Sequence, residues 1–482
     1  MILLWSMVKT LKTTKKTVKK RVKKSTSKVS KVKSKKAFRN YETALKYLYS
    51  RTNYEKETRL RYNVSTFNLS RMEKLLSLVG NPHKKTPTVH IAGTKGKGST
   101  ATMLARMLES NGYKVGLYTS PHVVELHERI TVDSEMINDD QMLGLLNRIY
   151  APVEKLAKTD EASFFEIMTA IAFMHFLDSK VDIAIIETGL GGRLDSTNVI
   201  KPEVIGITSL SLDHQGQLGS TIDSIAREKA GIFKRGVPVV TVKQHPEAMG
   251  VLESQAAAVN APFSVTGREI DFSYRFETSR EHGPHNRICL TTDTSKFEHL
   301  RVPLHGQHQA INCGLALAML DSLKSSGYEI DNEKAMEGLG NVFLAGRMEI
   351  VCEDPRIMID AAHNAASIKA LIHATGQNIP YDSMVIIFGC NSDKDVMGML
   401  NELQYGADKV IFTRSKSAKA MMPDELSDMY TEMCGKMCQS APSLGQALQL
   451  AKSAVGREDL ICITGSFYLI GQTKQRFQKT LA

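Results

Sequence analysis

Short runs of β-branched residues alternate with stretches of helical apolar spacing along most of this chain, and no other feature constrains its fold as strongly. Residues 89–92, 114–118 and 182–187 have the length and composition of buried strands. Residues 97–111 and 164–178, which lie between them, have helical spacing. Parallel strands covered by helices on both faces give this order of elements. The sequence therefore predicts an α/β fold built on a mainly parallel sheet.

A glycine-rich loop joins the first of these strands to its helix. Its residues are Gly93, Thr94, Lys95, Gly96, Lys97, Gly98, Ser99 and Thr100. Small residues let backbone N–H groups approach phosphate oxygens, and the helix N-terminus adds about half a positive charge. Lys97 can reach terminal phosphates, while Ser99 or Thr100 can contact phosphate or metal. A glycine separates Lys97 from Ser99, so the loop is a variant of the common nucleotide-binding pattern.

The pattern changes after the first set of strands and helices. Residues 262–304 are polar and rich in turns, which predicts antiparallel ribbons, and residues 332–345 resemble a connection between domains. Buried-strand runs then resume at 357–361, 384–390, 409–413 and 460–464. We expect a P-loop ATPase-type central domain over 40–343 and a smaller Rossmann-like α/β domain over 344–482. A cleft between two such domains suits a site for several substrates.

The first 39 residues differ from the rest in charge. They hold 13 Lys and 2 Arg, with neither Asp nor Glu. Subtracting these 15 from the 62 basic residues of the chain leaves 47, against 51 acidic residues. Segment 1–39 has too few apolar residues to offset the entropy of ordering, so we interpret it as a disordered extension. Accessory contact with nucleic acid or an anionic surface stays open, whereas the rest of the chain has no basic excess.

Cysteine usage and hydropathy indicate the compartment. The seven cysteines are scattered without a disulfide pattern, which favours a reducing environment. No apolar run reaches the roughly 18 residues that a membrane span needs. The apolar residues 2–5 are too few for a signal peptide, and an organellar presequence does not fit a segment in which Lys outnumbers Arg. We expect a cytoplasmic protein without a membrane segment, and a monomer.

Motifs continue in a fixed order through most of the chain after residue 41. They lie at residues 67–69 with 71–72, 90–99, 118–122, 128–130, 187–198, 212–214, 227–232, 306 with 308 and 312, 346–347, 360–364 and 465–466. In this order they resemble the folylpolyglutamate synthase and dihydrofolate synthase family of the Mur ligase superfamily. Gln215 and Ala365 depart from the family pattern, which has Thr and Pro there. Neither position is one at which we expect chemistry.

This resemblance implies an ATP-dependent ligase that adds L-glutamate to a folate or to dihydropteroate through an acyl phosphate. The resemblance also implies two Mg²⁺ sites. Ser120 and Glu187 would hold one ion with the ATP phosphates, and His214 would help to hold the second. Lys229 would complete the second site as an N6-carboxylated lysine, because a carbamate turns the amine into an oxygen ligand. With Lys97 and Arg347, His214 and Lys229 form the predicted catalytic set.

Further roles follow from the same resemblance. Asn312 would contact the adenine side of ATP, Arg347 its phosphates, and Asp360 its ribose. His363 and Ser466 would lie near phosphate or the incoming glutamate. The remaining candidates face the folate: Arg193 and Asp195, with Phe67 and Asn68 as weaker ones.

Two other functions compete with this interpretation. A Mur-type ligase acting on a UDP-sugar carries a whole UDP-binding domain before the phosphate loop, and the roughly 50 residues between segment 1–39 and Gly93 are too few for one. A non-catalytic nucleic-acid-binding protein would need basic residues across its folded body. Within the folate branch, the sequence does not decide between dihydropteroate and reduced folates. We favour a bifunctional enzyme, because no organellar presequence is evident.

Overall fold

The computed structural model describes residues 37–55, 63 and 66–481, and it separates Met1–Ala37 from a compact unit, Phe38–Ala482. The predicted disordered extension, 1–39, lies outside the described residues up to residue 36. Its end is wrongly placed, because Phe38 is buried and its backbone N–H donates to Asn147 Oδ1 at 2.8 Å. No helix among the described residues is long and apolar enough to cross a membrane.

The larger sheet of the compact unit has eight strands, in the order β4-β3-β2-β5-β1-β6-β7-β8. The strands are β1 (Thr88–Ala92), β2 (Val115–Tyr118), β3 (Ile130–Val132), β4 (Glu135–Met136), β5 (Ile183–Glu187), β6 (Val204–Ile207), β7 (Val239–Thr241) and β8 (Phe263–Val265). Six neighbouring strands run parallel, and only β3 and β4 at one edge are antiparallel. The predicted, mainly parallel sheet is confirmed.

Alternating residues of the central strands supply two separate cores. Ile183 and Ile185 pack into one core, and Ala184 and Ile186 pack into the other. The first core contains α3 (Lys97–Ser110), α9 (Gln307–Ser325) and α10 (Asn332–Gly340). The second contains α1 (Tyr41–Tyr49), α2 (Leu69–Leu78), α4 (Asp139–Ala157) and α5 (Phe164–Ser179). Helices α7 (Ile222–Ala230) and α8 (Pro246–Ala258) cover β6 and β7. Strands that are buried on both faces explain the continuous apolar runs of the sequence.

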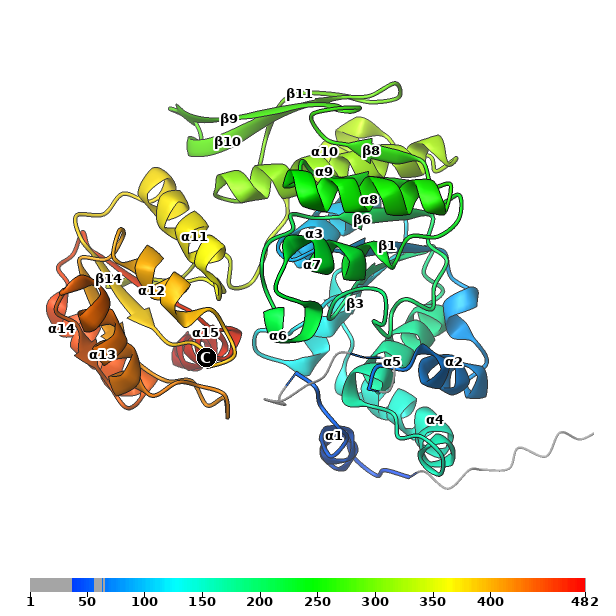
Figure 1. The fold of residues 1–482 in the computed structure, drawn as a ribbon, viewed down its shortest axis with the longest axis horizontal. Coiled ribbons are helices and arrows are strands. Elements are labelled where there is room, and N and C mark those ends of the chain that lie inside the picture. Colours follow the sequence, from blue (N-terminus) through cyan, green and yellow to red (C-terminus); the bar gives the residue numbers. More distant parts are fainter. Residues whose placement is uncertain (1–36, 56–62, 64–65, 482) are drawn as a thin grey trace, which may run out of the picture. The chain divides into compact units, whose positions relative to one another are not determined.

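The segment 262–304 forms the expected antiparallel ribbons. Strands β9 (Asp271–Ser279), β10 (Gly283–Thr291) and β11 (Lys296–Arg301) pair as a separate three-stranded sheet. This sheet packs beside α9, at the top of the view in Figure 1.

The segment 332–345 is not only a connection. Its first nine residues form α10, which packs on α3 and buries Ala335 and Leu339. The four-residue spacing of these two apolar residues is a helical signal, and it outweighs the polar residues around it.

The C-terminal half contains a second sheet of six strands, in the order β12-β13-β17-β14-β15-β16. Its strands are β12 (Glu349–Glu353), β13 (Arg356–Ile359), β14 (Met384–Phe388), β15 (Lys409–Phe412), β16 (Gln439–Ser440) and β17 (Leu460–Thr464). Its helices are α11 (Ala365–Asn378), α12 (Val396–Leu403), α13 (Pro423–Cys434), α14 (Leu444–Ala454) and α15 (Phe467–Leu481). Five of the strands are parallel, and the sequence analysis missed only the short strands at the two edges, β12 and β16. The smaller α/β unit is confirmed.

Helix α10 belongs to the core, so substitutions on its buried face should lower the free energy of unfolding. Leu339 is fully buried, so Leu339→Ala should lower the free energy of unfolding by about 2–5 kcal/mol through lost burial and a cavity. Glu337 is exposed on the same helix, and Glu337→Ala should change the free energy of unfolding by less than about 0.5 kcal/mol. Urea denaturation of both variants compares them. If both substitutions changed the free energy of unfolding by equally small amounts, residues 332–345 would be a linker and not part of the core.

Candidate active site

A cavity of about 700 Å³ lies at the carboxyl ends of the central parallel strands. Parallel sheets place ligand sites at this edge, because the loops that follow the strands meet there. The cavity is also lined by loops of the C-terminal sheet. The predicted site residues that line it are Gly93, Thr94, Lys95, Gly96, Lys97, Gly98, Ser99, Ser120, Glu187, Asp195, His214, Lys229, Asn312, Arg347, Asp360, His363 and Ser466. The side chains that we expected to act together are therefore brought together.

The phosphate loop has no room for side chains at two of its glycines. Gly96 precedes α3 with φ of 85°, and a Cβ there would lie 2.1 Å from Asn312 Oδ1. A Cβ on Gly93 would lie 1.7 Å from Thr208 Oγ1. The backbone of the loop thus lies directly against Asn312, at the N-terminus of a helix where anions are favoured. Thr100 is the exception among the predicted loop residues 93–100. It is fully buried beneath the loop and does not line the cavity.

Glu187 ends β5 and is buried beside the phosphate loop. One carboxylate oxygen accepts a hydrogen bond from the backbone N–H of Ser120 at 3.1 Å, and the other lies 3.9 Å from Lys97 Nζ. Burial raises the pKa of Glu187, and the charge of Lys97 opposes that shift. A buried carboxylate favours positive charge beside it, and Lys97 supplies part of that charge. Glu187 therefore offers hard oxygen ligands within reach of the loop.

Lys229 lies in the last turn of α7 and reaches the first residue of the same loop. Its side chain is almost fully buried, and Nζ donates to the carbonyl oxygen of Gly93 at 2.7 Å. Burial, together with the charge of Lys97, lowers the pKa of Lys229 to about 7. Near neutral pH, a large share of this amine is therefore uncharged. A neutral amine is nucleophilic, whereas an ammonium is not.

His214 follows β6 in the left-handed region, with φ of 52°. Burial lowers the pKa of His214 to about 3, and Lys394 adds to the shift, so its imidazole is neutral at physiological pH. The neighbouring Asp213 accepts hydrogen bonds from Lys394 Nζ at 3.0 Å and from Asn364 Nδ2 at 3.4 Å. These contacts join a loop of the central sheet to loops of the C-terminal sheet. Sequence analysis missed Lys394, although a charged residue soon after a buried strand was a usable signal.

Three further candidates lie on the C-terminal side of the cavity. The guanidinium of Arg347 lies 5.4 Å from the ring centroid of Phe467, which positions it by a cation–π contact. Asp360 accepts two backbone N–H bonds, at 2.8 and 3.0 Å, and burial raises its pKa. His363 Nδ1 donates to the carbonyl of Ala361 at 2.8 Å, which leaves a lone pair on Nε2. Burial lowers the pKa of His363 to about 4, so this imidazole is neutral as well.

The two residues predicted to face a folate differ in position. Asp195 lines the cavity, but its carboxylate accepts hydrogen bonds from the backbone N–H groups of Gly189, Leu190 and Thr197. It therefore organises its own loop. Arg193 does not line the cavity, because its guanidinium turns to Glu228 at 2.8 Å. The structure does not support Arg193 as a substrate contact.

The two predicted metal sites differ in how well their residues fit Mg²⁺. No three His, Cys, Asp or Glu side chains gather to hold a metal in the part of the chain that the structure describes. Glu187 and Ser120 fit one Mg²⁺, because they are adjacent oxygen donors and this ion keeps several water or phosphate ligands. Lys229 as an amine is a hydrogen-bond donor and does not fit. The second site requires the amine to be converted into a carbamate.

Comparison with known proteins identifies the family. The Mur ligase middle domain matches residues 91–320, and the Mur ligase glutamate ligase domain matches residues 346–467. The dihydrofolate synthase/folylpolyglutamate synthase of Bacillus subtilis is 35% identical over 425 residues, which cover 87% of this chain and 97% of that protein. The chain belongs to the folylpolyglutamate synthase/dihydrofolate synthase family. The dihydrofolate synthetase of Saccharomyces cerevisiae is 30% identical and is matched over 84% of this chain and 96% of its own length.

Solved structures of family members have the same fold. The Mycobacterium tuberculosis folylpolyglutamate synthase complexed with ADP has a TM-score of 0.82 and 31% identity, covering 91% of this chain and 99% of that one. The Escherichia coli family member in complex with DHPP and ADP has a TM-score of 0.79 and 26% identity, covering 93% and 100%. The resemblance inferred from motifs is therefore confirmed, as is the two-part α/β architecture.

The geometry of the phosphate loop predicts the effect of one methyl group. Gly96→Ala combines an unfavourable positive φ with a clash against Asn312, so it should weaken the binding of a non-hydrolysable ATP analogue at least about tenfold. Gly112 has a similar φ of 89° but open space around it, and it lies away from the cavity. Gly112→Ala should cost stability without changing nucleotide affinity. Calorimetric titration with the ATP analogue measures the affinity of each variant. Equal affinities of the two variants would contradict the assignment of residues 93–100 as the phosphate loop.

Proposed function

We propose that this chain is an ATP-dependent amide ligase that joins L-glutamate to the carboxylate of a folate-type substrate. The supporting observation is that the phosphate loop, Glu187 and Lys229 share one cavity with Arg347 and His363 from the C-terminal half. Family members named as folylpolyglutamate or dihydrofolate synthases, including one complexed with ADP, support the same reaction. A ligase needs a nucleotide, an acid and an amine at one place, and loops of two sheets meet at this cavity.

The first step activates a carboxylate, which is a poor electrophile. A carboxylate oxygen attacks the γ-phosphorus of ATP, the bond from that phosphorus to ADP breaks, and an acyl phosphate forms. The protein's task is to position the groups and to stabilise negative charge on the transferring phosphoryl group. The N–H groups of the phosphate loop, Lys97 and Arg347 are the groups that we assign to this task. Arg347 suits it, because its planar fork matches phosphate oxygens.

Mg²⁺, when bound, neutralises charge on the phosphate oxygens. We assign one ion to Glu187 and Ser120, and a second to His214 and a carbamylated Lys229. The carbamate forms when the neutral amine of Lys229 attacks CO₂ and loses a proton. The Lys229 pKa of about 7 makes the neutral amine available near neutral pH. His214 is neutral at physiological pH, as a metal ligand must be.

The second step joins the amine to the activated acid. The glutamate amine attacks the acyl carbon, the bond to phosphate breaks, and the amine loses a proton as the amide forms. We assign His363 and Ser466 to the side on which glutamate enters, because both line the C-terminal wall of the cavity. We assign the removal of that proton to Nε2 of the neutral His363, which lies 4.0 Å from Asp213 Oδ2. We assign Asn312 and Asp360 to the adenosine part of ATP, and Asp195 to organising the loop beside the folate.

Both dihydropteroate and reduced folates are proposed as acceptors. The Bacillus subtilis relative is named for both activities, whereas the Saccharomyces cerevisiae relative is named for one. We also propose a monomer in the cytoplasm, and the seven free cysteines support a reducing compartment. Accessory binding of nucleic acid through the Lys-rich segment falls outside the described residues and stays a prediction.

Phosphate release from purified protein tests the proposed function. With ATP, Mg²⁺ and L-glutamate present, adding either dihydropteroate or tetrahydrofolate should stimulate release, and mass spectrometry should find a product with one glutamate more. Offering the two acceptors separately distinguishes a bifunctional enzyme from a specialised one. Stimulation by neither acceptor, but by a UDP-linked muropeptide, would overturn the folate assignment.

The carbamate has a chemical signature of its own. Lys229→Ala should lower kcat at least about 100-fold, because a metal ligand is lost. A short carboxylic acid such as acetate should restore part of the activity by occupying the vacated space. Lys234 is a matched control: it is half-buried nearby, donates to Asn198, and does not line the cavity. Lys234→Ala should show no response to acetate. Full activity of Lys229→Ala without any additive would exclude the carbamate role.

A further inference from the structure

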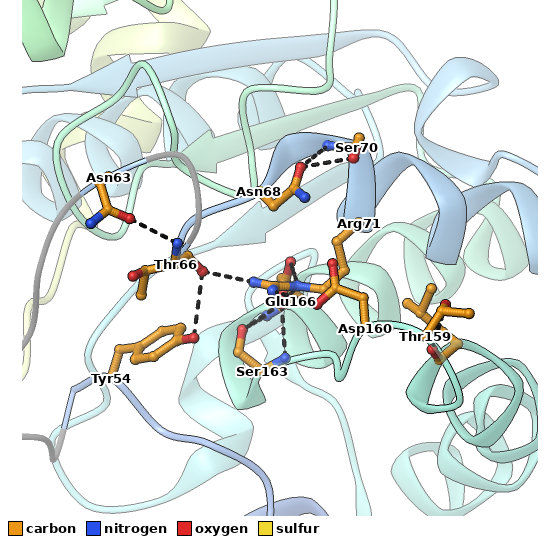
Figure 2. A network of polar contacts seen from close by, with 11 residues as sticks. Tyr54, Asn63, Thr66, Asn68, Ser70, Arg71, Thr159, Asp160, Ser163 and Glu166 are labelled. Carbon is orange, nitrogen blue, oxygen red and sulfur yellow. Dashed lines mark hydrogen bonds and ion pairs between the residues drawn. The ribbon is translucent and has the colours of Figure 1, made fainter.

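A buried arginine outside the phosphate end of the cavity joins two loops and the first turn of α5, as Figure 2 shows. Arg71 is in the first turn of α2 and is 5% exposed. Its Nε donates to the two carboxylate oxygens of Glu166 at 2.8 and 2.9 Å. One terminal nitrogen donates to Asp160 Oδ1 and the other to the carbonyl oxygen of Thr66, each at 3.0 Å. Every nitrogen of the guanidinium is therefore engaged.

The carbonyl partner belongs to a loop that lines the cavity. Thr66 immediately precedes Phe67 and Asn68, both of which line it. Asn68 also caps α2, because its side chain accepts the backbone N–H of Ser70 at 3.0 Å. The bond from Arg71 thus fixes the loop one residue before Phe67, at the point where the chain enters the helix.

The carboxylate partner belongs to the first turn of α5, which also lines the cavity. Glu166 caps α5, and it accepts bonds from the backbone N–H and the hydroxyl of Ser163, both at 2.8 Å. Phe164 and Phe165 stand between these two residues and line the cavity. The ring of Phe165 in turn fills the space above Gly189, where a Cβ would lie 2.5 Å from Cζ. Arg71 is therefore coupled through α5 to the loop that Asp195 organises.

A third lining segment meets the same carbonyl. The hydroxyl of Tyr54 lies 3.4 Å from the carbonyl oxygen of Thr66, and the rings of Tyr54 and Phe67 have centroids 5.0 Å apart. Tyr54, Phe67 and Phe165 all line the cavity, and we call these three residues the aromatic wall. Aromatic walls suit flat, conjugated ligands, and a folate-type substrate carries such a ring system.

We propose that Arg71 is a positioning residue that holds the aromatic wall in place for the ring system of the folate-type substrate. This inference rests on the proposed function. A buried guanidinium is favourable only when all of its partners are present, so the network has one arrangement rather than several. That arrangement sets the position of the loop that carries Phe67 relative to the first turn of α5, which carries Phe165. Arg71 itself lines the cavity, but its guanidinium is engaged by protein partners, so it acts on the substrate through these two segments.

Steady-state kinetics of Arg71→Met separates this role from a general structural one. The acceptor to use is whichever of dihydropteroate and tetrahydrofolate the wild type converts more efficiently. The KM for this acceptor should rise at least about tenfold, while the KM for ATP stays within about twofold. The acceptor KM of Arg71→Lys should lie between those of the wild type and Arg71→Met, because one ammonium can bond Glu166 but cannot span three partners. The matched control is Arg51→Met. Arg51 pairs with Glu161 at 2.8 Å and with Glu154, but it does not line the cavity. Its KM values should be unchanged.

Several outcomes would overturn the proposal. They are equal rises in KM for ATP and for the acceptor, an unchanged KM for the acceptor in folded Arg71→Met, or the same shift in Arg51→Met. If Arg71→Met does not fold, Arg71→Lys and Asp160→Asn provide the same comparison, because both keep a cation at position 71. Failure of the proposed function is seen separately, as wild-type protein that binds an ATP analogue but releases no phosphate with either acceptor.

Discussion

Charged groups that leave water must find partners, and around the phosphate loop this requirement decides where each functional side chain can lie. Glu187 and Lys229 contact different residues of the loop, one from the end of a strand and the other from the end of a helix. Between them, Lys97 compensates the carboxylate and raises the cost of a second ammonium. Because Lys97 is coupled electrostatically to both groups, a change in one of the three alters the protonation of the others.

The C-terminal half extends this arrangement. Asp213 is held by Lys394 and Asn364, which come from loops of the C-terminal sheet. The adjacent His214 therefore has a backbone that is fixed from both halves of the compact unit. Because the Asp213 contacts involve charged and polar groups, they can exchange partners with water more easily than an apolar interface. A site that must admit three substrates benefits from an interface of this kind.

Sequence patterns predicted the fold and the phosphate loop for a physical reason. Buried strands need apolar runs, and a loop that approaches phosphate needs residues without side chains, so Gly93 and Gly96 were both visible and necessary. Other assignments depend on three-dimensional details that a motif does not contain. Thr100 comes directly after Ser99, but one helical step turns its side chain into the core. Arg193 matched a motif, yet Glu228 on a distant segment draws its guanidinium away from the cavity.

Two buried cations show how surroundings decide what a basic residue does. Burial acts against the charge of both Arg71 and Lys229. For Arg71, two carboxylates outweigh burial and raise its pKa, so the guanidinium stays charged and its bonds persist at any physiological pH. Lys229 donates to a carbonyl oxygen, and burial with a second cation nearby outweighs the more distant carboxylates, so its pKa falls. One residue is thereby suited to hold loops in place, and the other to change its chemical form. Both began as the same signal in the sequence, a basic residue on a helix, and only their partners separate the two roles.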